Sequence, residues 1–321
     1  MHAHAGRCFL AGLDAAHPLA VALQGEQVAE ALASARQAGM TAVGLATVAD
    51  LLVLGPDPDG GLHAVRAFAP DEARADHARQ LHGLVELIDR VGAPVVRTAA
   101  DIDRAHTEDR TAVMISCEGG DFLEGDLEPL VEARRLGVSS LTLVHYRVND
   151  IGDIQTEAPV HGGLTPFGRQ VVAEANRLHV IIDCAHATLA VTRDVLESSA
   201  DPVMISHSHL DHADRHHPRL LSDEHATAVA AAGGLIGAWP SGVTSATLAD
   251  FVDEIVRLVD LVGVDHVAIG TDLDANYRPV LRRYDEFASL DDLLSERGLG
   301  SEEADQVLGG NALELLRRVA G

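Results

Sequence analysis

The chain has 321 residues, of which 47% are hydrophobic, and it carries a formal net charge of −25. The acidic excess argues against nucleic acid or an anionic membrane as a partner, and no apolar run approaches the roughly 20 residues of a membrane span. Three cysteines, none of them in a CxxC pair, and the absence of an apolar leader favour a cytoplasmic location.

Apolar runs of four to eight residues alternate along the chain with longer segments of helical periodicity. This alternation predicts a parallel sheet covered by helices on both faces. The predicted strands are 41–47, 111–117, 139–144, 179–185, 202–207, 234–239 and 266–271. The predicted helices are 26–38, 71–91, 126–136, 167–178, 222–232 and 246–262.

Seven such strands, with a possible short one at the N-terminus, predict an α/β fold of the (β/α)₈ TIM-barrel type. A doubly wound open sheet is the alternative, although no G-x-G-x-x-G motif follows the first predicted strand. Residues 55–63 are expected to form an exposed loop and residues 275–292 a long excursion after the last strand. No linker divides the chain, so residues 1–321 are taken as a single barrel domain whose first strand is short or missing.

Several predicted strands end in side chains that can bind a metal ion or move a proton. These side chains are Glu118 in "TAVMISCEGG", His145 in "SLTLVHY", His186 in "VIIDCAHAT", His207 in "PVMISHSH", and Asp272 and Asp274 in "HVAIGTDLD". The carboxyl ends of parallel barrel strands open into one common mouth, so residues far apart in sequence can meet there. Carboxylate and imidazole groups without thiolates suit a catalytic zinc or a similar divalent ion, and one carboxylate can bridge two ions.

The histidine-rich stretch "HSHLDHADRHHPR" at 207–219 fits no closed zinc pattern, so only His207 and Arg219 are retained as site candidates. An arginine at the mouth can bind a carboxylate through two parallel hydrogen bonds. A surface ion pair between Arg219 and Asp223 or Glu224 is the alternative reading. The chain has no G-x-S-x-G motif, which disfavours a serine hydrolase.

From Thr111 to Asp274 the chain resembles the renal (membrane) dipeptidase family of zinc peptidases, a branch of the amidohydrolase-like barrels. The stretches that carry this resemblance include "ISCEGG", "HGGLTPFGRQVVAEANRL", "IIDCAHAT", "PVMISHSH", "VGVDHVAIGTDLDA" and, near the end, "GGNALELL". The resemblance implies a (β/α)₈ barrel that holds two zinc ions.

The resemblance also implies which residues bind the metal. Glu118 would bridge the two ions, and His186 and His207 would hold the second one. The family opens with a His-x-Asp pair that binds the first ion. In "MHAHAGRCF" the corresponding places fall to His2 and His4, and a second imidazole is an acceptable zinc ligand.

For the substrate, the resemblance implies that His145 contacts the carbonyl and stabilises the developing oxyanion, and that Arg219 binds the free carboxylate of a dipeptide. The "GTDLD" pair supplies the acid/base residue, for which Asp272 is favoured over Asp274. Four residues depart from the family pattern, which marks the chain as a divergent member: Tyr146 in place of Asn, Ala185 in place of Ser, Leu220 in place of Asn, and Glu314 in place of Arg.

The sequence therefore predicts a metal-dependent dipeptidase in which a metal-bridging hydroxide attacks the peptide carbonyl. Tyr146 and Leu220 motivate an alternative, a binuclear-metal amidohydrolase acting on a non-peptide amide, lactone or ester. A second alternative is a non-catalytic barrel that binds a ligand or a partner. A small dipeptide is the expected partner, and a homodimer is left open.

Overall fold

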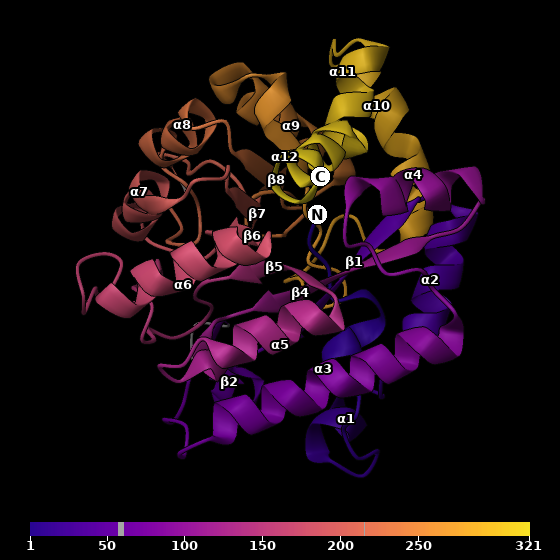
Figure 1. The fold of residues 1–321 in the computed structure, drawn as a ribbon. Coiled ribbons are helices and arrows are strands. Elements are labelled where there is room, and N and C mark those ends of the chain that lie inside the picture. Colours follow the sequence, from indigo (N-terminus) through magenta and orange to yellow (C-terminus); the bar gives the residue numbers. More distant parts are fainter. Residues whose placement is uncertain (57–60, 215) are drawn as a thin grey trace.

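The computed structural model describes residues 1–56, 61–214 and 216–321. Residues 57–60, on which part of the predicted loop 55–63 falls, and Arg215 lie outside the described residues. The chain forms a seven-stranded parallel sheet in the order β1-β4-β5-β6-β7-β8-β9, and helices surround this curled sheet (Figure 1). Each main strand pairs with the next one along the chain, as the barrel prediction requires, so the fold class is confirmed.

The seven strands lie within a few residues of the predicted ranges. They are β1 (Ala42–Val48), β4 (Ala112–Glu118), β5 (Val138–Thr142), β6 (Ile181–Asp183), β7 (Met204–Ser208), β8 (Leu235–Ala238) and β9 (Val267–Ile269). Most of these strands are buried along their whole length, because helices cover one side and the barrel interior lies on the other. A short antiparallel hairpin, β2 (Leu54–Pro56) and β3 (Leu62–Ala64), follows β1 outside the main sheet.

All six predicted helices are present in the described chain. They correspond to α2 (Val28–Gln37), α3 (Glu72–Val91), α5 (Glu128–Leu136), α6 (Pro166–Leu178), α8 (Asp223–Ala231) and α9 (Leu248–Val262). The sequence analysis missed the helices α1 (Pro18–Ala22), α4 (Ala99–Thr107), α7 (Leu189–Ser198), α10 (Leu290–Glu296), α11 (Ser301–Asp305) and α12 (Asn311–Ala320). Short 3₁₀ segments lie at η1 (Ala5–Leu10), η2 (Leu51–Val53), η3 (Asp121–Leu123), η4 (Val264–His266) and η5 (Tyr284–Ser289), and a π-helical segment, η6 (Gln306–Gly310), precedes α12.

The C-terminal helix α12 covers the amino end of the sheet. Its Leu315, Leu316 and Val319 pack in one apolar cluster with residues at the starts of the strands, such as Ala112 and Met204. Figure 1 shows α12 and both chain ends near the centre of the view. Apolar side chains therefore line this end of the barrel, and polar chemistry is left to the carboxyl ends of the strands.

The first four residues lie between β1 and the end of β9, the two outer strands of the sheet. Ala46 of β1 donates its backbone N–H to the carbonyl of Ala3 at 2.9 Å. On the other side, the backbone N–H of Thr271 donates to the carbonyl of His2 at 3.0 Å. This segment therefore connects the two strands that do not pair with each other, and it brings its own side chains to the mouth.

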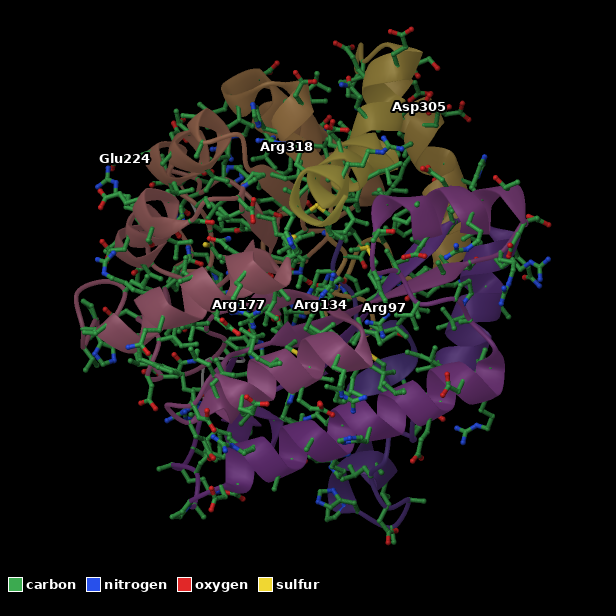
Figure 2. The ribbon with its side chains drawn as sticks, viewed as in Figure 1. Arg97, Arg134, Arg177, Glu224, Asp305 and Arg318 are labelled. Atoms are coloured by element: carbon green, nitrogen blue, oxygen red, sulfur yellow. The ribbon has the colours of Figure 1, made fainter. Side chains whose placement is uncertain are left out.

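Charged side chains project from the outer surface of the helices, for example Arg177 on α6 and Glu224 on α8 (Figure 2). Within the described part of the chain, no helix has the combination of length and apolar character needed to cross a membrane.

Candidate metal centre

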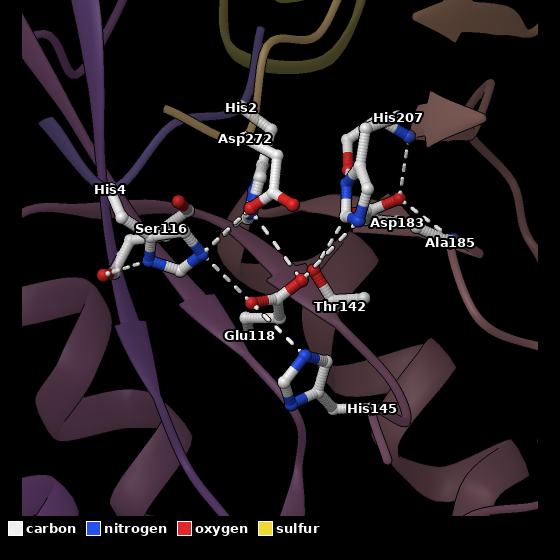
Figure 3. A network of polar contacts seen from close by, with 12 residues as sticks. His2, His4, Ser116, Glu118, Thr142, His145, Asp183, Ala185, His207 and Asp272 are labelled. Carbon is white, nitrogen blue, oxygen red and sulfur yellow. Dashed lines mark hydrogen bonds and ion pairs between the residues drawn. The ribbon is translucent and has the colours of Figure 1, made fainter. Parts of the chain in front are cut away.

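The predicted metal ligands converge at the carboxyl ends of the strands. Glu118 is the last residue of β4 and His207 lies in β7, whereas His186 follows β6. The N-terminal segment contributes His2 and His4. All five side chains are nearly fully buried, with exposed fractions between 1% and 3%, and most of them are drawn in Figure 3.

The carboxylate of Glu118 lies at the centre of two groups of ligand atoms (Figure 3). Its Oε2 is 3.0 Å from His4 Nε2, and its Oε1 is 3.4 Å from His2 Nε2. The same Oε1 is 3.3 Å from His186 Nε2 and 3.6 Å from His207 Nε2. The structure thus forms two buried His/Glu groups that share Glu118, the arrangement that a binuclear metal site requires.

The distances between the histidine nitrogens in each group match those expected for two nitrogens bound to the same metal ion. His2 Nε2 lies 3.3 Å from His4 Nε2, and His186 Nε2 lies 3.2 Å from His207 Nε2. Two nitrogens bound tetrahedrally to zinc at about 2.0–2.1 Å are separated by about 3.3 Å. In addition, Glu118 Oε1 is buried and has no hydrogen-bond partner among the described residues. An unpartnered buried carboxylate oxygen is costly unless a cation meets it, so the residues present fit a divalent ion.

The electrostatics of the second group suit metal binding. Burial lowers the pKa of His186 and of His207 well below the usual range, so both imidazoles are uncharged and offer lone pairs. Burial also acts to raise the pKa of Glu118, but the surrounding histidines outweigh it and hold that pKa well below the ordinary value. The group therefore presents one carboxylate charge and neutral nitrogens, which are the ligand forms that bind zinc.

The first group also involves Asp272. Burial acts to lower the pKa of His4, but hydrogen bonds to Asp272, Cys8 and Glu118 raise it well above the usual range. Asp272 Oδ1 lies 3.3 Å from His4 Nε2. Asp274 faces elsewhere, because its Oδ2 accepts a hydrogen bond at 2.7 Å from the backbone N–H of Gly6 and the residue is exposed. Of the "GTDLD" pair, only Asp272 lies at the metal groups.

The two glycines after Glu118 keep its loop close to the neighbouring strand ends. Gly119 has φ +89°, a conformation that other residues rarely adopt, and a Cβ there would lie 3.2 Å from Ala49 Cβ. A Cβ on Gly120 would lie 2.3 Å from the side chain of Ile151. The chain can therefore turn away immediately after Glu118 and leave the carboxylate at the mouth.

His145 stands on the other side of Glu118 and has a buried partner that the sequence analysis missed. Its Nε2 lies 3.4 Å from Glu118 Oε2, and its Nδ1 lies 2.6 Å from Asp50 Oδ1. Burial acts to lower the pKa of His145, but the charges of Asp50 and Glu118 outweigh it and raise this pKa to about 8. Asp50 follows β1 just as the other polar residues follow their strands. The apolar run 41–47 could have pointed to it.

Tyr146 and Arg219 line the site beside His186. The Tyr146 ring lies 4.5 Å from the His145 ring and 5.2 Å from the His186 ring. Arg219 is 3% exposed, and its Nη2 lies 3.3 Å from His186 Nε2. Arg219 Nη1 donates to Gln155 Oε1 at 3.0 Å, and the guanidinium lies 5.4 Å from the centre of the Trp239 ring. Arg219 is therefore a buried cation at the mouth and not part of a surface ion pair.

A buried carboxylate beneath the site fixes three strands. Asp183 Oδ1 accepts hydrogen bonds from the backbone N–H groups of Ala185 and Ser206, both at 2.9 Å, and its Oδ2 accepts one from Thr142 Oγ1 at 2.6 Å (Figure 3). These bonds join the ends of β5, β6 and β7, and so they set the relative positions of the strands that carry His186 and His207.

The other described histidines of the 207–219 stretch stay outside the metal centre. His209 is buried against Phe251, His212 pairs with Glu254, and His216 pairs with Asp211. Among residues 1–56, 61–214 and 216–321, the two groups around Glu118 are the ones with metal-ligand geometry.

Comparison with known families identifies the chain. The family model of the membrane dipeptidases, peptidase family M19, matches residues 67–321. The chain belongs to this family. The matched range includes Glu118, His145, His186, His207 and Arg219, whereas His2, His4 and Asp50 precede it.

Curated proteins similar to this M19 member are fungal dipeptidases. Dipeptidase tcpJ of Claviceps purpurea (strain 20.1) is 30% identical over 230 residues, which is 69% of this chain and 54% of the fungal protein. Dipeptidase verJ of Clonostachys rogersoniana is 30% identical over 247 residues, covering 74% of this chain and 63% of that protein. The chain thus spans little more than half to about two thirds of the length of these relatives.

Solved structures support the same fold. An amidohydrolase from Pseudomonas aeruginosa superposes with a TM-score of 0.77 at 25% identity, covering 91% of this chain and 93% of that one. The structure of dipeptidase AC, a metallopeptidase of family M19, gives a TM-score of 0.78 at 23% identity, covering 90% and 89%. At such identities the likeness to dipeptidase AC concerns the fold.

Proposed function

We propose that this protein is a zinc-dependent dipeptidase that hydrolyses the peptide bond of free dipeptides. The observation that carries the proposal is the sharing of Glu118 by two buried His/Glu groups, with the buried cation Arg219 beside one of them. Membership of family M19 supports the same reaction class.

In this proposal His2, His4 and Glu118 hold one ion, and Glu118, His186 and His207 hold the other. Zinc bound there supplies a Lewis acid and a water whose pKa falls to about 7. The chain's own residues supply the binding, orientation and proton transfer around that water.

Arg219 binds the free carboxylate of the dipeptide, because its guanidinium presents parallel donors in a water-poor pocket. The position of Arg219, 3.3 Å from His186, supports binding of that carboxylate beside the second metal group. His145 Nε2 donates a hydrogen bond to the carbonyl oxygen as that oxygen gains negative charge. Asp272 Oδ1 accepts the proton of the attacking water and then delivers it to the leaving amine.

Tyr146 supports a second candidate function. Its ring lies against both the His145 and the His186 rings, where it narrows the space for a substrate side chain. Burial raises the pKa of Tyr146 to about 12, so its hydroxyl stays protonated and can donate a hydrogen bond. A narrow pocket with an additional donor also suits a small non-peptide amide, lactone or ester.

The test is hydrolysis of a dipeptide panel, including D-residues at the second position, by zinc-loaded protein whose metal content is measured. We expect turnover that chelator abolishes and that Glu118→Gln loses together with bound zinc. The surface variant His82→Ala is the matched control and should keep both the metal and the activity. Turnover of an ester or lactone but of no dipeptide would overturn the proposal in favour of the second candidate.

A further inference from the structure

Asp50 is a fully buried carboxylate at the mouth of the barrel that the metal groups do not use. It follows β1 and is 0% exposed. The strand end that carries it is fixed, because the backbone N–H of the preceding Ala49 donates to the carbonyl of Glu118 at 2.8 Å. A buried charge is costly unless it is paired, so its contacts indicate its role.

Both oxygens of Asp50 are engaged by consecutive residues of the loop after β5. Oδ1 lies 2.6 Å from His145 Nδ1, and Oδ2 accepts a hydrogen bond at 3.0 Å from the backbone N–H of Tyr146. An ionised carboxylate only accepts hydrogen bonds, so the proton of this contact belongs to His145 Nδ1. The backbone bond to Tyr146 prevents the carboxylate from turning away.

The consequence for His145 is a fixed orientation. With Nδ1 bound to Asp50, the opposite nitrogen, Nε2, faces the metal groups at 3.4 Å from Glu118 Oε2 (Figure 3). Rotation of the ring about its Cβ–Cγ bond would break the 2.6 Å contact inside a buried site, at the cost of an unpaired carboxylate.

The packing around this pair leaves little room for other arrangements. A Cβ on Gly119 would approach Ala49 Cβ to 3.2 Å and His145 Cβ to 3.5 Å. The loops after β1, β4 and β5 are therefore in contact through a glycine, and the carboxylate and the imidazole are held together from both sides.

We propose that Asp50 is a positioning residue, which holds the His145 ring so that Nε2 faces the scissile carbonyl of the substrate. This inference rests on the proposed function. It concerns a residue outside the range matched by the family model, which begins at residue 67. Hydrogen-bond partners that orient metal-binding histidines typically contribute about 10–100-fold to metal affinity or activity, and we expect an effect of the same order for Asp50 on His145.

The experiment is a double-mutant cycle with the zinc-loaded enzyme, comparing Asp50→Asn, His145→Gln and the double variant. Asp50→Asn should lower kcat by about 10–100-fold with KM and zinc content nearly unchanged. The double variant should be no slower than His145→Gln alone, because Asp50 acts only through His145. Losses of kcat that multiply in the double variant would overturn the inference. So would an Asp50→Asn variant in which only KM or only the zinc content changes.

Asp153→Asn is the matched control. Asp153 is a buried aspartate in the same loop after β5, but its oxygens accept from backbone N–H groups, such as those of Val160 and His161, and not from His145. Its effect on kcat should be small and should multiply with that of His145→Gln. If Asp50→Asn does not fold, Asp50→Ser, which leaves room for a water, replaces it in the cycle.

A second readout separates this inference from the proposed function. In ¹⁵N-histidine NMR of zinc-loaded protein, the Nδ1 signal that His145→Gln removes should shift in Asp50→Asn and stay in place in Asp153→Asn. A shifted signal in a protein that cleaves no dipeptide would refute the proposed function and leave the positioning contact standing. An unshifted signal in an active dipeptidase would refute the role of Asp50 alone.

Discussion

His186 Nε2 and His207 Nε2 lie 3.2 Å apart inside the barrel, and both approach the same oxygen of Glu118. One shared proton can satisfy the two nitrogens, but it leaves Glu118 Oε1 without a hydrogen. A bound cation satisfies all three atoms together. The folded chain should therefore bind zinc much more tightly than the unfolded chain does.

Removal of metal is accordingly expected to destabilise the protein. A ligand present at about 1,000 times its dissociation constant stabilises the native state by about 4 kcal/mol. Chelator should thus lower Tm by several degrees in thermal unfolding followed by circular dichroism, and added zinc should restore it. Glu118→Gln, which lacks the shared charge, should show the same Tm with and without chelator. An unchanged Tm in chelated wild-type protein would contradict a resident metal.

Asp272 and Asp274 should differ in their effect on catalysis. Asp272 Oδ1 contacts His4 in the first metal group, whereas the exposed Asp274 accepts a hydrogen bond from the backbone N–H of Gly6. Asp272→Asn should lower kcat about 10²–10⁴-fold through loss of the proton-transfer group. Asparagine tolerates the φ of +55° at this position, so the backbone should be retained.

Asp274→Asn keeps an oxygen that can accept from Gly6, and it should change kcat less than about tenfold, in contrast to the Asp272 variant. Steady-state kinetics on one dipeptide, with zinc content measured for both variants, makes the comparison. The reverse pattern, with Asp274→Asn the slower enzyme, would assign the acid/base role to the other aspartate.

The sequence was most informative where one local signal decided the structure. Near-continuous apolar strands and amphipathic helices predicted the barrel, because the hydrophobic periodicity and the length of each element can be recognised from residues that are adjacent in the sequence. The strand ends predicted that Glu118, His186 and His207 would meet, since parallel strands share a mouth. The missed helices α4 and α7 have 9 and 10 residues and are no shorter than the predicted α5 and α8, but their N-caps at Thr98 and Thr188 are weak signals in isolation.

The sequence could not predict which side chains of separate loops contact one another at the mouth of the barrel. The choice between Asp272 and Asp274 depends on a turn that aims one side chain at His4 and the other at Gly6. Asp50 stood after a predicted strand, but its importance comes from a partner 95 positions away in the chain. Such pairings depend on how separate loops pack, which no local pattern encodes.

Arg219 is expected to act on substrate binding through the substrate's carboxylate. A hydrogen bond to a charged group contributes about 1.5–3 kcal/mol, so Arg219→Met should raise KM for free dipeptides by about 10–100-fold. C-terminally amidated dipeptides lack the negative charge, so they should be poor substrates of the wild type, and the substitution should not make them worse. Zinc content must be measured, since Arg219 also contacts His186. An equal loss on both substrate types would argue against carboxylate binding.

Asp121 should make stability depend on pH. Burial and the nearby charge of Asp50 raise the pKa of Asp121 from 3.8 to about 6, although Arg147 opposes the shift. A carboxyl group whose folded pKa exceeds its unfolded value holds its proton more tightly in the native state. Its contribution to stability is therefore complete below about pH 4 and is lost as the pH rises through about 6.

Asp121→Asn removes this titration, so the free energy of unfolding of the variant should rise relative to wild type between pH 4 and pH 7. The shift of about two pKa units corresponds to a relative gain of up to about 3 kcal/mol. Urea denaturation of both proteins at several pH values, with chelator present so that metal release does not contribute, measures this difference. The exposed carboxylate variant Asp126→Asn is the control and should show no comparable rise. A difference between Asp121→Asn and wild type that stays constant with pH would show that Asp121 is already ionised in the folded protein at pH 4.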